Sequence, residues 1–295
     1  MRFLKFAALL LSVLLLCACA APVSSGGVAA TTGPVAQFAR AIAAGTDVTV
    51  TQVIADSVSC LHDYSLSVRQ MQTIEDSRLV LISGAGLEAF MEDALAAAGT
   101  VVDCSEGVSL LHLDEHEDHD HDHDHDHDHG EYDPHIWLDP DNAAIMARNI
   151  CTALTQVYPD CAGIFQENTD QLIQRLQALD DYGTETLADL SCRQLITFHD
   201  GFAYLAQAYD LEILEAIEEE SGSEASAAEL ISIIQLIEDH HLPAVFTEAN
   251  GSVSAAGIIE AETGVPHYAL DMALGGSDYF DAMKHNIDTL KEALQ

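Results

Sequence analysis

Four residues with metal-binding side chains stand at or just beyond the ends of predicted strands. They are His62, His135, His199 and Asp271. In open α/β sheets, ligands bind beyond the carboxyl ends of the strands. Neutral imidazole is a strong zinc ligand, and one carboxylate would complete a tetrahedral site. A structural role is the simpler interpretation of any one histidine alone, but the shared position of the set predicts a single zinc site.

A second group of histidines fills one short tract. Residues 112–130 read HLDEHEDHDHDHDHDHDHG, and Leu113 is the one apolar residue among them. The histidines of the tract are His112, His116, His119, His121, His123, His125, His127 and His129. We expect a disordered surface loop that binds several zinc ions weakly, because a flexible chain must lose conformational entropy to wrap an ion. The alternative is a solvated acidic spacer.

The charge balance excludes one class of partner. Ten Lys and Arg face 49 Asp and Glu, which gives a formal net charge of −39. Nucleic acid is not expected as a partner, because the neutralisation of phosphates needs a basic face. Such a strongly acidic chain instead favours solubility and the attraction of cations.

The first residues have the pattern of a bacterial lipoprotein signal. Arg2 and Lys5 precede an apolar stretch over 7–16, which is shorter than the ~20 residues of a spanning helix. The sequence Leu-Cys-Ala-Cys then ends at Cys19, with a small residue before the cysteine. We predict a signal peptide over 1–19, lipid on Cys19, a tether over 20–27 and an extracytoplasmic location on the cell membrane. An ordinary secretory peptide is the alternative.

The cysteines that follow the signal allow a disulfide. An extracytoplasmic compartment permits such bonds. Cys151 and Cys161 flank a helix end and a Tyr-Pro-Asp turn, so they could close a small loop. Buried unpaired thiols are an equally weighted alternative.

The remaining chain alternates short β-rich runs with helical runs, which indicates βα units and parallel sheets. The predicted strands are 28–32, 48–55, 79–83, 100–103, 195–198, 244–247 and 267–270. The predicted helices are 34–44, 66–74, 87–98, 141–158, 162–190, 202–208, 227–239, 255–262 and 279–294. The helix over 162–190 is long enough to be a rigid connector between the two βα halves.

Several motifs together resemble the zinc- and manganese-type substrate-binding lipoproteins of bacterial ABC importers. They are His62-Asp63-Tyr64, Gly84-Ala85-Gly86-Leu87-Glu88, Asp133-Pro134-His135-Ile136-Trp137-Leu138-Asp139-Pro140, His199-Asp200-Gly201-Phe202-Ala203-Tyr204, Phe246-Thr247-Glu248, and Glu262-Thr263-Gly264 ahead of Leu270-Asp271. Two departures from the family pattern are Ser65-Leu66-Ser67 and Met272-Ala273, and the second directly follows Asp271.

The resemblance implies two parallel-sheet α/β domains joined by one long rigid helix, with the metal site in the cleft between them. The domains would be 28–158 and 191–295, and the linker helix 159–190. It implies the same ligands, His62, His135, His199 and Asp271, and the acidic His-rich tract is typical of the zinc branch. Glu248 matches an acidic position near the cleft, where a carboxylate can orient metal-bound imidazoles.

The function that the resemblance implies is an extracytoplasmic zinc receptor that delivers Zn²⁺ to an ABC importer permease. Such a protein would be a monomer and no enzyme. Two alternatives belong to other classes: a metal-buffering or adhesive surface lipoprotein, and a zinc hydrolase. A hydrolase needs a metal-bound water and a positioned base, and the sequence holds no His-Glu-x-x-His motif, although Glu248 is an available carboxylate.

Overall fold

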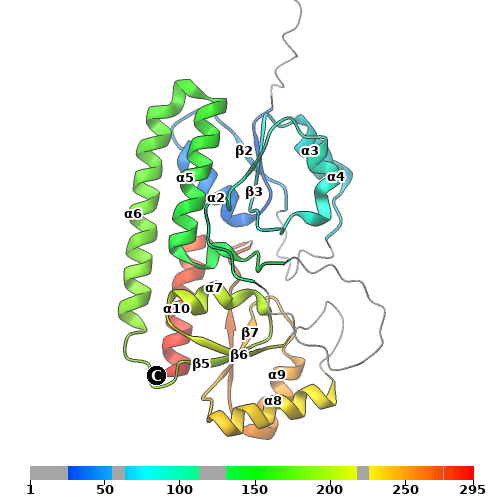
Figure 1. The fold of residues 1–295 in the computed structure, drawn as a ribbon, viewed down its shortest axis with the longest axis vertical. Helices are drawn as coiled ribbons and strands as arrows, with labels where there is room; N and C mark the ends of the chain where they lie inside the picture. Colours follow the sequence, from blue (N-terminus) through cyan, green and yellow to red (C-terminus); the bar gives the residue numbers. More distant parts are fainter. Residues whose placement is uncertain (1–25, 55–63, 113–130, 218–225, 275) are drawn as a thin grey trace, which may run out of the picture.

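The protein contains two four-stranded parallel sheets with helices packed around them (Figure 1). The computed structural model describes residues 26–54, 64–112, 131–217, 226–274 and 276–295. The strand orders are β2-β1-β3-β4 in the first sheet and β6-β5-β7-β8 in the second. The strands are β1 (Val28–Ala30), β2 (Val50–Gln52), β3 (Leu79–Ile82), β4 (Val101–Asp103), β5 (Gln194–Thr197), β6 (Glu212–Ala216), β7 (Val245–Glu248) and β8 (His267–Leu270).

Helices connect these strands and separate the two sheets along the chain. The α-helices are α2 (Gly33–Ala43), α3 (Val68–Asp76), α4 (Glu92–Ala96), α5 (Pro140–Val157), α6 (Ala162–Thr186), α7 (Ala203–Ala208), α8 (Ala227–His240), α9 (Ser254–Thr263) and α10 (Tyr279–Leu294). The 3₁₀ turns of the described ranges are η1 (Ala89–Met91), η2 (Ile136–Leu138), η3 (Pro159–Cys161) and η4 (Asp200–Phe202). Because the connections within each half are βα units, the carboxyl ends of the strands in a sheet meet at one edge.

The long helix α6 runs past both halves of the molecule (Figure 1). Its buried apolar residues recur at helical spacing, as Phe165, Leu172, Leu176 and Leu179 show. Near its end, a side chain on Gly183 would collide with the ring of Tyr209, so the close packing there requires glycine. One amphipathic stripe therefore holds α6 along its whole length.

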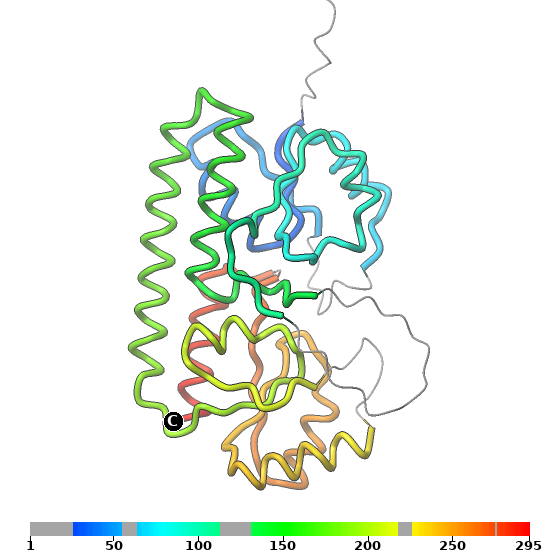
Figure 2. The backbone as a smooth tube through the Cα atoms, viewed as in Figure 1, coloured from blue at the N-terminus to red at the C-terminus, as the bar shows by residue number. Residues whose placement is uncertain are grey.

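The end of the chain returns to the end of α6. Figure 2 shows the C-terminus beside the segment that leaves α6. The N–H groups of Ser191 and Cys192 both donate to the carbonyl of Leu294 at 3.1 Å. Helix α10 is thus fixed at the base of the second sheet while it packs against α6 and α2.

One hydrophobic core extends through both halves. The same cluster of buried side chains includes Val28 of the first sheet and Phe246 and Leu270 of the second. A smaller cluster, which includes Ile233 and Ile259, lies under α8 and α9. Because the main cluster crosses from one sheet to the other, the two halves pack tightly against each other.

The predicted fold class is confirmed, with local corrections. Strand β6 is missing from the sequence prediction, and β2 is shorter than the strand predicted over 48–55. The helix predicted over 87–98 is instead the turn η1 followed by the short helix α4. The cause is Glu88, whose carboxylate accepts from the N–H groups of Ser83 and Gly84 and so holds the chain in a turn. Helix α6 ends at Thr186 rather than at Leu190.

The possible disulfide between Cys151 and Cys161 is not formed, because both are free thiols in the structure, so the alternative of unpaired thiols is the one observed. Cys151 is buried on the inward side of α5, whereas Cys161 ends the turn η3 and is partly exposed. The predicted signal, Cys19 and the tether through residue 25 lie outside the described residues. Within the described ranges, no helix has the length and apolar character needed to cross a membrane.

Candidate metal centre

Two of the predicted ligands, His135 and His199, lie against each other. Their ring centroids are 5.2 Å apart, and the rings meet edge to face. His135 directly precedes η2 in the segment between β4 and α5, and His199 follows β5 and precedes η4. The structure therefore brings together two imidazoles that the sequence places far apart.

A buried carboxylate orients His135. The Oδ1 atom of Asp133 lies 2.8 Å from His135 Nδ1 and accepts the main-chain N–H of His135 at 2.9 Å. Both residues are buried. An imidazole that donates a hydrogen bond from Nδ1–H to a carboxylate keeps the Nε2 lone pair for a metal. Asp133 is thus a candidate functional residue that the sequence analysis does not single out, although its place two residues before His135 is a usable signal.

His199 has a similar partner. Its Nδ1 lies 2.9 Å from Oδ1 of Asp200, the next residue in the chain. Both side chains are partly shielded from solvent, with 16 % and 28 % of their surfaces exposed. Each of the two histidines is therefore paired through Nδ1 with a carboxylate close to it in sequence.

The turn after His199 approaches the ring of His135 very closely. A β-carbon at position 201 would stand 2.8 Å from His135 Nδ1, and it would also collide with the methyl group of Met272. Gly201 is buried in η4. The missing side chain at this position lets the two histidine segments pack against each other.

Glu248 ends β7 and is buried. Burial raises the pKa of its carboxyl group to about 7, His199 opposes this rise, and Asp271 adds to it. The electrostatic influence of His199 and Asp271 on Glu248 indicates that the three residues share one environment.

The third predicted ligand that the structure describes is Asp271, which directly follows β8. Its carboxylate accepts from the N–H of Ala273 at 2.7 Å and from the hydroxyl of Ser277 at 2.9 Å. Its main-chain N–H and C=O groups bond to Asn286 of α10. Its position in the chain, immediately after a strand of the second sheet, agrees with the sequence prediction.

The described residues do not complete a metal site. Among them, no group of three or more His, Cys, Asp or Glu side chains is close enough to hold a metal ion. His62 lies outside the described residues, as do all tract histidines except His112. His112 is exposed, forms an antiparallel bridge with Tyr132, and lies 3.9 Å from Glu131.

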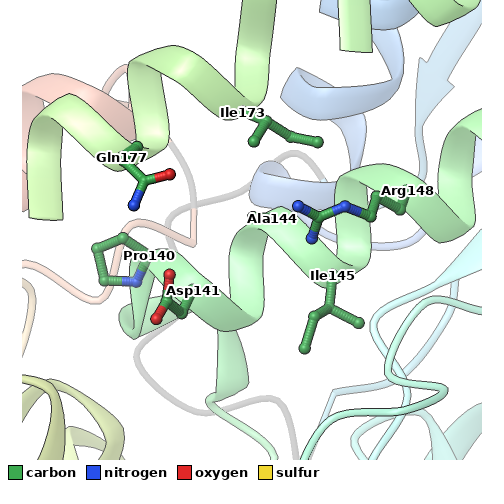
Figure 3. Close-up of a pocket in the computed structure, with 7 residues that line it drawn as sticks. All are labelled: Pro140, Asp141, Ala144, Ile145, Arg148, Ile173 and Gln177. Atoms are coloured by element: carbon green, nitrogen blue, oxygen red, sulfur yellow. The ribbon is translucent and has the colours of Figure 1, made fainter. Parts of the chain in front are cut away.

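A pocket of about 240 Å³ lies elsewhere, between α5 and α6 (Figure 3). Its lining residues are Pro140, Asp141, Ala144, Ile145, Arg148, Ile173 and Gln177. One carboxylate and one guanidinium offer no set of ligands for a transition metal. The chemistry of the histidine pair is therefore separate from this pocket.

Comparison with known proteins places this chain among metal-transport proteins. A family model described as the periplasmic component A of the zinc-uptake complex matches residues 28–293. The high-affinity zinc uptake system protein ZnuA of Bacillus subtilis is 30 % identical over 245 residues, which cover 79 % of this chain and 77 % of that protein. The zinc-binding lipoprotein AdcA of Streptococcus pneumoniae is 27 % identical, over 88 % of this chain and 54 % of that protein.

Solved structures share the fold. The crystal structure of the metal-dependent lipoprotein YcdH from Bacillus subtilis has a TM-score of 0.75 and 26 % identity, and the match covers 92 % of this chain and 99 % of that one. The similarity therefore extends over both sheets and the long helix between them.

Proposed function

The chain belongs to the family of the periplasmic component A of the zinc-uptake complex, and from this premise we propose that it is an extracytoplasmic receptor for Zn²⁺. It would capture the ion outside the cytoplasmic membrane and deliver it to the permease of an ABC importer. In this proposal zinc is the cargo of the protein.

The observation that carries the proposal is the pair formed by His135 and His199. Their rings lie 5.2 Å apart, and each Nδ1 atom is 2.8–2.9 Å from a carboxylate oxygen. Zinc favours neutral imidazole ligands, and a carboxylate at the far nitrogen fixes the tautomer and the ring orientation. We propose His62 and Asp271 as the other two ligands.

A closed site of four protein ligands favours a receptor over a hydrolase. A catalytic zinc keeps one position open for water and needs a positioned base. Glu248 is the nearby carboxylate that could serve as that base. We propose instead that it supports the histidines electrostatically, because its environment includes His199 and Asp271.

The tract histidines have a separate role in this proposal. Weak binding at many sites would raise the local zinc concentration, while the site between the two halves would hold one ion tightly. The ends of the tract are close together, because Asp133 N–H donates to the Leu111 carbonyl at 2.9 Å and His112 bridges to Tyr132.

The remaining parts of the proposal concern the placement of the protein. We propose that lipid on Cys19 anchors a monomer to the cell membrane and that residues 20–27 are the tether. The domain boundaries that we propose are 28–158 and 191–295, with residues 159–190 as the linker helix. Support comes from the position of α6 between the two sheets in the chain.

The test is zinc titration of the mature chain and of a variant in which a short Gly-Ser linker replaces residues 113–130. This variant keeps the residues that pair at the base of the tract: Asp133 still donates to Leu111, and His112 still bridges to Tyr132. We expect one tight zinc site in both proteins, and additional weak binding only in the protein that keeps the full tract. Loss of the tight site with the tract would favour the buffering or adhesive alternative, and zinc-dependent turnover of esters or peptides would favour the hydrolase.

A further inference from the structure

Asn286 holds the main chain of Asp271 from both sides. The Asn286 side chain is fully buried on α10. Its Oδ1 atom accepts the N–H of Asp271 at 2.7 Å, and its Nδ2 group donates to the Asp271 carbonyl at 2.8 Å. One side-chain amide thus satisfies both main-chain polar groups of the residue that follows β8, and it fixes the path of the chain at that point.

The carboxylate of Asp271 is restrained as well. Oδ1 accepts the N–H of Ala273 at 2.7 Å, and Oδ2 accepts the hydroxyl of Ser277 at 2.9 Å. Ala273 is fully buried and adopts a left-handed φ of 56°, a conformation that alanine rarely takes. Backbone conformations of this kind persist where the surrounding structure determines them, and they cluster at ligand sites.

The other half of the molecule holds the same segment. The indole N–H of Trp137 donates to the carbonyl of Met272 at 2.8 Å. Gln37 of α2 repeats the arrangement of Asn286: its amide donates to the Ser277 carbonyl at 3.0 Å and accepts the N–H of Tyr279 at 2.8 Å. The segment between β8 and α10 is therefore fixed from both halves.

We propose that Asn286 is a positioning residue for metal capture, which presents Asp271 to the cation as a preformed ligand. The inference rests on the proposed function, because it takes Asp271 as a zinc ligand. Rigid ligands bind more tightly because the entropy of ordering them is already lost in the free protein. Partners of metal ligands typically account for a 10- to 100-fold change in affinity when they are mutated.

A merely structural role for Asn286 in α10 makes different predictions, and a double-mutant cycle separates the two. We would measure zinc affinity by chelator competition for the wild type, Asn286→Ala, Asp271→Ala and the double variant. We expect Asn286→Ala to bind zinc about 10- to 100-fold more weakly, and to cause no further loss in the Asp271→Ala background. Thr289→Ala is the matched control, because Thr289 is another buried polar residue of α10. It should change the melting temperature without changing zinc affinity.

A second measurement needs no metal. Hydrogen exchange at the main-chain N–H of Asp271 and Ala273 should become faster in Asn286→Ala and stay at the wild-type rate in Thr289→Ala. Asn286→Asp serves if the alanine variant does not fold, because it keeps the acceptor and removes the donor. We expect its zinc affinity to fall as well.

The outcomes separate this inference from the proposed function. A wild-type protein that binds no zinc would overturn the function and the inference together. Equal affinities of the wild type and Asp271→Ala would remove Asp271 from the ligands and overturn the inference. Suppose instead that Asp271→Ala binds zinc more weakly than the wild type. Wild-type zinc affinity in Asn286→Ala, or fully additive losses of affinity in the double variant, would then overturn the positioning role and leave the receptor function intact.

Discussion

His135 and His199 come from different parts of the chain, and their rings meet edge to face with centroids 5.2 Å apart. His135 lies in the connection before α5, whereas His199 follows the first strand of the second sheet. An ion bound to both imidazoles would link the two halves of the protein.

Asp133 should matter to zinc affinity through His135. Asp133→Asn removes the charge next to His135 Nδ1 and keeps the side-chain shape. We expect zinc to bind about 10- to 100-fold more weakly, because the imidazole loses the carboxylate that orients it. Chelator competition measures the change. Asp200→Asn is the parallel variant at the more exposed pair formed by His199 and Asp200, and we expect a smaller loss of zinc affinity there. An unchanged affinity in Asp133→Asn would contradict the orienting role.

His199 should set the preference for zinc over manganese. Imidazole suits zinc, whereas manganese favours oxygen ligands. We expect His199→Glu to narrow the zinc-to-manganese affinity ratio and His199→Ala to weaken both metals. Competition titrations of the protein without the tract measure the ratio. Wild-type zinc affinity in His199→Ala would remove His199 from the ligand set.

Gly201 should be intolerant of even one added carbon atom. In Gly201→Ala the new methyl group would press on the ring of His135, where a β-carbon stands 2.8 Å from Nδ1. We expect zinc affinity to fall, because the ring must turn away from its position beside His199. Gly257→Ala is the matched control, since a β-carbon there meets no atom within 4 Å. Equal effects of the two substitutions would argue against the close packing of the histidine segments.

Glu88 should make the free energy of unfolding depend on pH. Burial raises the pKa of its carboxyl group from 4.5 to about 7, although hydrogen bonds from Thr31, Gly84 and Ser83 oppose the rise. Between these values the folded protein holds a proton that the unfolded chain has released. The contribution of Glu88 to the free energy of unfolding is therefore fully present below pH 4.5 and is lost as the pH rises through 7.

Denaturant unfolding without metal tests this prediction on the wild type and Glu88→Gln. Since glutamine does not titrate, the stability of the wild type relative to the variant should fall by about 3 kcal/mol as pH rises across this range. A constant difference between the two proteins would mean that Glu88 is ionised at all these pH values in the fold.

Local pattern was sufficient to predict most of the elements and the positions of His199 and Asp271 after strands, whereas His135 instead precedes the turn η2. The continuous apolar run over Leu79–Ile82 indicates β3, and the spacing of Phe165 and Leu172 indicates α6, because both patterns depend on near neighbours in the chain. Strand β6 could not be predicted in this way. Its sequence Glu-Ile-Leu-Glu-Ala has no clear alternation, and its extended form depends on pairing with β5, where the register shifts between Leu195 and Ile196.

Contacts between distant residues depend on how the elements pack, which near neighbours in the chain do not specify. Cys151 and Cys161 are close in sequence, yet the rotation of α5 buries one thiol while the other stands in a turn. In the sequence, Asn286 has no feature that distinguishes it from other helical residues. Its hydrogen bonds to Asp271 exist because α10 packs beside the end of β8. The residue types and chain positions of the candidate ligands are thus visible in the sequence, whereas the orientation of their side chains depends on long-range packing, because the direction of a side chain is set by the elements that surround it.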